Sequence, residues 1–144
     1  MSRFIALNAL LQPVKDGADA VAELDTQQNL IIALPSSEAF TQLQTFGDAQ
    51  KLCADLRIGG HDDWRLPTVA EAFACIDYTR HDPATQSQAF GSTKEDWAWT
   101  STPCAWRSGA SWCVDFYDGL VDGYGHFYRC FVRAVRSVPP APGQ

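Results

Sequence analysis

The segment DDWRLPTVAEAF, residues 62–73, restricts the backbone more than any other part of this sequence. Pro67 disfavours helical backbone at the residue before it, so the chain up to Leu66 is expected to run extended. Thr68 and Glu71 have the T-x-x-E spacing of a capping box, which begins a helix. The predicted buried face of that helix consists of Val69, Ala72, Phe73 and Ile76. The segment therefore predicts a rigid junction between a strand-like chain and a helix.

Two side chains in this junction have a structural and a functional interpretation. Arg65 could bind an anionic ligand, but it lies between acidic residues and a capped helix, where a bidentate contact with a carboxylate would hold the loop. Trp64 could be a platform for a sugar, but its alternation with Leu66 favours a place in the core. We therefore expect both residues to be scaffolding.

Elsewhere, short apolar runs bounded by polar or Gly- and Pro-containing segments predict strands. These runs cover residues 4–7, 29–34, 97–102, 111–116 and 130–136. Helices in the middle of the chain followed by several such strands predict an α+β fold. A polar segment of low hydrophobicity, residues 77–96, is predicted to be a long loop.

A second helix is predicted over residues 45–56, where apolar residues recur at helical spacing. Thr45 and Asp48 resemble a capping box at its start. Gly59 and Gly60 are expected to end it, because glycine adopts the left-handed conformation found after helices.

Length and charge restrict the class of protein. The 144 residues predict one domain, residues 1–138, with a flexible Pro-rich tail at 139–144. A formal net charge of −6 without a Lys/Arg cluster argues against direct binding of nucleic acid. No run approaches the about 18 apolar residues of a membrane span, and no signal peptide is recognised. The expected location is the cytoplasm, or the host cytoplasm or virion if the protein is phage-encoded.

The five cysteines form an odd set without a C-x-x-C pair, which argues against a zinc ribbon or a complete disulfide framework. Buried thiols are the expected state in a reducing compartment. In an oxidising compartment, Cys104 with Cys113 is the pair to test first. The three histidines are isolated in the sequence and predict no zinc site.

Five stretches together carry a resemblance to a known family: LDTQQNLIIA, FGDAQKLCADLRIGGHDDWRLPTVAEAFACID, WAWTST, WCVDFYDG and VRAVR. They resemble the Lcl C-terminal domain family over about residues 21–137. The resemblance implies a C-type-lectin-like fold related to formylglycine-generating enzymes, with two helices packed on a twisted antiparallel sheet and long loops. Two positions depart from the family pattern: a glycine is missing from the turn near Gln28, and Ala134 replaces a frequent cysteine.

The resemblance also raises calcium, through which many C-type lectins bind sugars. The lectin signatures E-P-N, Q-P-D and W-N-D are absent, and no bidentate glutamate follows at EF-hand distance. Asp118-Gly119 and Asp122-Gly123 are therefore read first as turns. No cofactor is expected, with calcium kept as an alternative.

The remaining candidate chemistry lies in two Gly- and aromatic-rich loops, residues 103–110 and 117–129, whose composition is typical of recognition surfaces. We expect a non-catalytic recognition domain that binds a protein or a glycan, in an oligomeric state that the sequence does not reveal. The alternatives are a phage protein that inhibits a host defence complex and a cysteine-dependent enzyme related to formylglycine-generating enzymes. The candidate ligand-binding residues are Trp106, Arg107, Asp118, Asp122, Tyr124, His126 and Tyr128.

Overall fold

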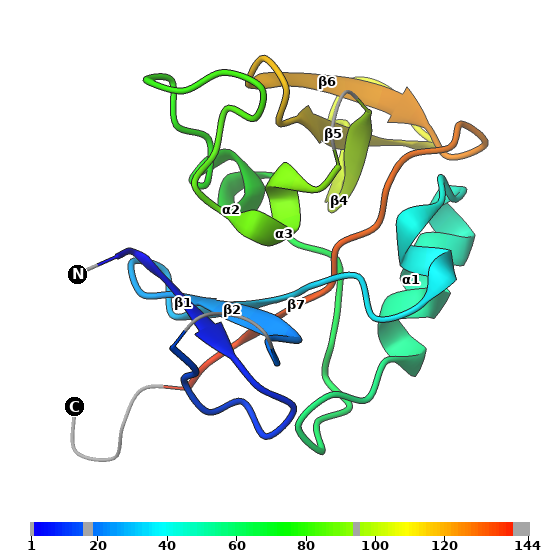
Figure 1. The fold of residues 1–144 in the computed structure, drawn as a ribbon. Helices are drawn as coiled ribbons and strands as arrows, with labels where there is room; N and C mark the ends of the chain where they lie inside the picture. Colours follow the sequence, from blue (N-terminus) through cyan, green and yellow to red (C-terminus); the bar gives the residue numbers. More distant parts are fainter. Residues whose placement is uncertain (1, 16–18, 94–95, 140–144) are drawn as a thin grey trace.

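The computed structural model describes residues 2–15, 19–93 and 96–139, whose strands form two antiparallel sheets (Figure 1). One sheet has the order β1-β2-β3-β7 and consists of β1 (Phe4–Leu7), β2 (Ala22–Asp25), β3 (Leu30–Ala33) and β7 (Val135–Ser137). The other has the order β4-β5-β6 and consists of β4 (Trp97–Pro103), β5 (Ala110–Asp115) and β6 (Leu120–Gly125). The predicted α+β class is confirmed. The tail beyond residue 139 lies outside the described residues.

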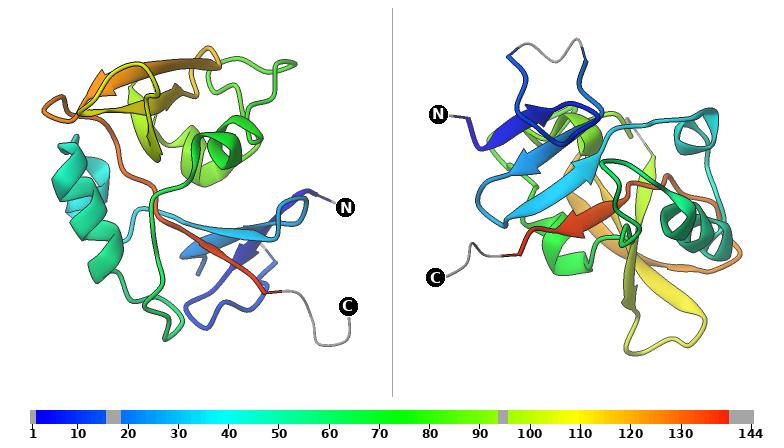
Figure 2. Two further views of the ribbon diagram at one scale, coloured as in Figure 1. Left: turned by 180° about the vertical axis from the view of Figure 1, so that it is seen from behind. Right: turned by 90° about the horizontal axis from the view of Figure 1, so that it is seen from below.

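The helices are short and lie beside and between the sheets. A 3₁₀ turn (Glu38–Thr41) precedes α1 (Phe46–Asp55), and α2 (Val69–Phe73) and α3 (Gln88–Gly91) follow. Figures 1 and 2 show α2 and α3 between the two sheets, with α1 at the side. Among the described residues no helix is both long and apolar enough to cross a membrane.

The junction at the start of α2 forms as predicted. The Thr68 hydroxyl accepts a hydrogen bond from the Glu71 N–H, and the Glu71 carboxylate accepts one from the Thr68 N–H. The predicted buried face is only partly correct, because Ala72 is buried but Phe73 is 50% exposed. The helix ends at Phe73, so its inward face is too short to bring that ring into the core.

The start of α1 differs from its prediction. Thr45 is the N-cap residue, but its side chain makes no capping hydrogen bond. Asp48 is one methylene shorter than the glutamate of a capping box, so the reciprocal contact does not form. The helix ends at Asp55, and Gly59 and Gly60 form the next turn, both at positive φ.

Two strands were not predicted, and one predicted strand is shorter. The sequence of β2 is AELD and that of β6 is LVDGYG, and both are rich in residue types that are depleted in strands. Both strands depend on pairing with distant segments: β2 with β1 and β3, and β6 with β5. Of the predicted strand 130–136, only its last two residues belong to β7.

Of the segment predicted as a long loop, residues 77–96, the structure describes 77–93 and 96, and this part contains α3, which packs into the core. Ala89 and Phe90 are fully buried. The Glu23 carboxylate of β2 accepts hydrogen bonds from the Ser87 hydroxyl and from the N–H groups of Gln88 and Ala89. A buried carboxylate therefore attaches this segment to the four-stranded sheet.

Candidate functional site

Exposed aromatic rings gather on one end of the three-stranded sheet. Trp106 is 67% exposed and lies edge-on to Trp112, with ring centroids 6.5 Å apart. Phe127 is 74% exposed and stacks on Tyr128 at 4.8 Å. We call these four residues together with Arg107 the aromatic surface.

Two glycines of β6 let the loops of this surface lie directly on the sheet. A Cβ atom at Gly123 would lie 2.4 Å from the Cys104 sulfur and 3.7 Å from the Trp106 ring. At Gly125 it would lie 2.9 Å from the Phe127 ring and 3.3 Å from an Arg107 guanidinium nitrogen. Because residues two apart on a strand share a face, both loops meet on the same side of β6.

Tyr124 and His126 support this surface from beneath. The Tyr124 ring lies 5.3 Å from the Trp97 ring and 5.6 Å from that of Tyr128, and burial raises its pKa. The His126 ring stacks on Phe46 of α1 at 4.0 Å, and its Nε2 lies 2.9 Å from the Ser111 hydroxyl. The structure therefore places these two predicted ligand residues at the join between the sheet and the core.

The two aspartates are separated from each other. Asp122 is exposed on β6 and accepts a hydrogen bond from the Gly123 N–H. Asp118 lies at the opposite end of β5 and β6, with an oxygen 2.7 Å from His81 Nε2. Over residues 2–15, 19–93 and 96–139, no group of three or more His, Cys, Asp or Glu side chains could hold a metal ion.

Arg65 makes the predicted carboxylate contact. Its guanidinium forms a bidentate ion pair with Glu71, at 2.7 and 2.9 Å, and donates to the Ser137 hydroxyl. Burial disfavours a charged Glu71, but the hydrogen bonds from Arg65 and Thr68 outweigh it and lower the Glu71 pKa. Trp64 is buried in the core, as expected. This junction is therefore scaffolding.

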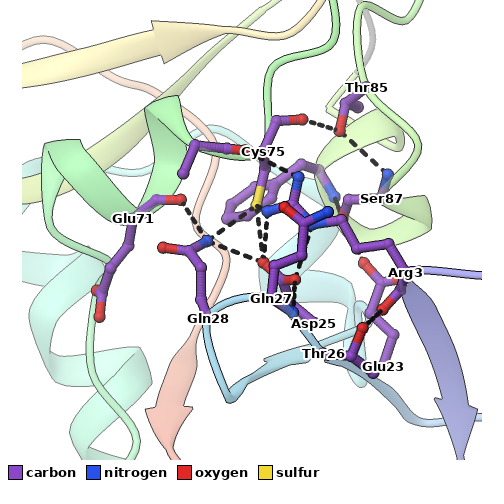
Figure 3. Close-up of polar contacts among 12 residues, drawn as sticks. Arg3, Glu23, Asp25, Thr26, Gln27, Gln28, Glu71, Cys75, Thr85 and Ser87 are labelled. Carbon is purple, nitrogen blue, oxygen red and sulfur yellow. Dashed lines mark hydrogen bonds and ion pairs between the residues drawn. The ribbon is translucent and has the colours of Figure 1, made fainter.

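A polar cluster that sequence reasoning missed surrounds the buried carboxylate of Asp25 (Figure 3). Arg3 donates to both oxygens, at 2.8 and 2.7 Å, and the Gln28 amide and Gln27 N–H donate at 2.9 and 3.0 Å. Burial opposes ionisation of Asp25, but these hydrogen bonds prevail and hold its pKa below the usual value. The adjacent Cys75 thiol is also buried, which together with the Asp25 charge raises its pKa to about 12.

The missing glycine of the family pattern marks this cluster in the sequence. Asn29 has a φ of 51°, so asparagine adopts the left-handed conformation in the turn after Gln28. The cluster borders a polar pocket of about 400 Å³, lined by residues that include Arg3, Gln27 and Tyr78. In the sequence, the departure from the family pattern near Gln28 pointed to this turn, but it did not identify Arg3 as a member of the cluster.

All five cysteines are buried and free, but the pair that the fold brings together is not the predicted one. The sulfurs of Cys113 and Cys130 lie 3.7 Å apart. Cys104 lies against Gly123, which pairs with Trp112, and Cys113 therefore points to the other face of the sheet. Nearness in the sequence placed Cys104 and Cys113 together, whereas strand alternation separates them.

Comparisons with known proteins identify the family. The search of curated proteins finds no match. A family model described as the Lcl C-terminal domain matches residues 19–136, which include β2 to β6, most of β7, Asp25 and the aromatic surface, whereas Arg3 and β1 precede the match. The chain therefore belongs to the Lcl C-terminal domain family.

Proposed function

We propose that this chain is a non-catalytic recognition domain that binds a protein partner through the aromatic surface. The observation that carries the proposal is the exposure of Trp106, Phe127 and Tyr128 beside Arg107. Trp, Tyr and Arg are the residue types that most often dominate binding energy at protein interfaces. Within the part of the chain that the structure describes, Arg107 forms no ion pair, so its charge is available to a partner.

The shape of the surface favours a protein over a small ligand. Four pockets of the structure have volumes from about 190 to about 530 Å³, and none of the five aromatic-surface residues lines them. Small ligands bind preferentially in concave sites, whereas protein partners use exposed rings as anchors. A C-type-lectin-like arrangement, which the family resemblance implies, is part of the proposal, because loops at one end of such a fold are its recognition surface.

The state of the thiols argues against the cysteine-dependent enzyme. The thiolate is the nucleophilic form of cysteine. Burial raises the pKa of Cys53 and of Cys75 to about 12, and it also raises that of Cys113. Burial therefore disfavours the thiolate at three of the five cysteines, which supports the choice of a recognition domain over a cysteine-dependent enzyme.

The test is capture of a partner by immobilised protein from bacterial lysate, followed by an affinity measurement on the purified pair. Trp106→Ala and Phe127→Ala are expected to weaken binding by about 30-fold each, the loss of a central interface side chain. Phe73→Ala is the matched control, because Phe73 is an exposed ring on α2, outside this surface.

Two results would contradict the proposal. Binding that is insensitive to Trp106→Ala and Phe127→Ala but lost in Phe73→Ala would move the interface to α2. A glycan array probed with and without calcium provides the other arm. Binding to the glycan array that is lost in Trp106→Ala, without any stoichiometric protein partner, would show that the ligand is a glycan and not a protein.

A further inference from the structure

A pair of buried thiols lies in the core beneath the sheet that carries the aromatic surface. The sulfurs of Cys113 and Cys130 are 3.7 Å apart, although the two residues are separated by 17 positions in the chain. Cys113 belongs to the central strand β5. Cys130 forms a bridge with Gln44 and directly precedes Phe131, which pairs with Ala98 of β4.

We propose that Cys113 and Cys130 are a redox modification site, which a small disulfide such as oxidised glutathione converts into an intrachain disulfide. One cysteine, as thiolate, attacks a sulfur of the oxidant and releases one glutathione thiolate. The other cysteine then attacks the mixed disulfide on the protein and releases the second. The two cysteines lose two protons and two electrons, and the electrons reduce the oxidant to two thiols.

The geometry selects this pair among the five cysteines. A disulfide requires sulfurs about 2.05 Å apart, so the two sulfurs must approach by more than an ångström. Cys113 is held by pairing on both sides of β5, and Cys130 is held by two backbone hydrogen bonds with Gln44, so we expect rotation of the two side chains to bring the sulfurs together. Cys104 is excluded because it lies on the opposite face of the sheet.

Burial determines when the reaction occurs. Cys113 is fully buried and Cys130 is 3% exposed. Burial raises the pKa of Cys113, so little thiolate exists in the closed protein and brief exposure to oxidant leaves the pair reduced. Oxidation proceeds through local opening or during folding in an oxidising compartment. The bridge then holds the end of the loop that carries Phe127 and Tyr128 against β5.

The experiment uses the whole chain refolded from urea with and without oxidised glutathione. We expect the oxidised protein to lose about 2 Da, the mass of two hydrogens, and a non-reducing digest to join the peptides of Cys113 and Cys130. A loop of this length raises the thermal midpoint by about 5–10 °C, and reductant reverses the rise. Cys104→Ala is the matched control and keeps both results.

Three outcomes would overturn the proposal. These are a Cys104–Cys113 link, glutathione adducts that persist on Cys113 or Cys130, and no mass loss after refolding with oxidant. Cys113→Ala and Cys130→Ala must each abolish the mass loss, so either variant serves if the other does not fold. None of these measurements depends on the identity of a binding partner, so they stand apart from the proposed function.

Discussion

The aromatic surface and the Asp25 cluster each contain an arginine but use it in opposite ways. Arg3 donates to a buried carboxylate and to the Ala74 carbonyl, and its charge is compensated. Arg107 lies beside the exposed ring of Phe127. A guanidinium whose donors are satisfied internally stabilises the fold, whereas one that remains exposed among rings is available to a partner. The difference between Arg3 and Arg107 therefore lies in their surroundings, not in the residue type.

The largest expected effect comes from breaking the cluster. Asp25→Ala leaves the Arg3 guanidinium and the Gln28 amide without their acceptor, and we expect the free energy of unfolding to fall by about 3 kcal/mol. Urea unfolding measures it. Asp122→Ala, which removes an exposed carboxylate, is the control and changes stability by less than about 0.5 kcal/mol. Equal losses of stability in Asp25→Ala and Asp122→Ala would show that the buried cluster contributes no more to stability than an exposed carboxylate.

The next largest expected effect on stability comes from adding a methyl group at Gly123, beneath the aromatic surface. In Gly123→Ala the new Cβ lies 2.4 Å from the Cys104 sulfur, and this overpacking should cost about 2 kcal/mol. Combining it with Cys104→Ala removes the clashing atom, so the double variant should be more stable than additivity predicts. If the changes in the free energy of unfolding, measured with heat or urea, are strictly additive, the loop that carries Cys104 moves away from the new methyl group freely.

The pH dependence of stability separates two carboxylates of β2. The lowered pKa of Asp25 contributes stability that is present above the usual carboxyl pKa and lost as pH falls through the folded value. Burial raises the pKa of Glu23, whose contribution is present at low pH and lost as pH rises through its folded value. In urea titrations from pH 3 to 7, Asp25→Asn should flatten the rise of stability with pH, and Glu23→Gln should steepen it. If stability changes with pH at the same slope in both variants as in the unsubstituted protein, these roles of Asp25 and Glu23 are refuted.

The smallest expected change in stability comes from removing the exposed guanidinium of Arg107. Arg107→Ala should alter the free energy of unfolding by less than about 0.5 kcal/mol, because its guanidinium forms no ion pair within the described ranges. It should nevertheless weaken partner binding about tenfold. Unfolding and affinity measured on the same preparation test both expectations. A large loss of stability would place Arg107 with Arg3, as a residue of the scaffold.

Local signals predicted part of the fold. The capping box of Thr68 and Glu71 formed because its hydrogen bonds join residues three positions apart. The same reasoning failed at Thr45, where Asp48 is too short for the reciprocal contact. The strands β2 and β6 escaped prediction because pairing with distant segments, not their own composition, stabilises them.

The structure brings together only some of the residues that the sequence selected as candidate ligand-binding residues. Loop composition selected Trp106, Arg107 and Tyr128, which the structure brings to one exposed surface. It also grouped Asp118 with them, although that residue lies at the far end of the β5–β6 pair. Composition detects the residue types of a recognition surface but carries no information about the end of a strand on which they lie.

By itself, the sequence determined the helix junction and the Arg65 scaffold contact, because these depend on neighbours within a few positions. The order of helical and strand-like segments also indicated the α+β class. Only the tertiary structure decided that Cys113 meets Cys130 and that Arg3 meets Asp25. Such contacts depend on strand register and on which face of a sheet each side chain occupies. A shift of one position reverses that face, and no local pattern encodes the partner strand.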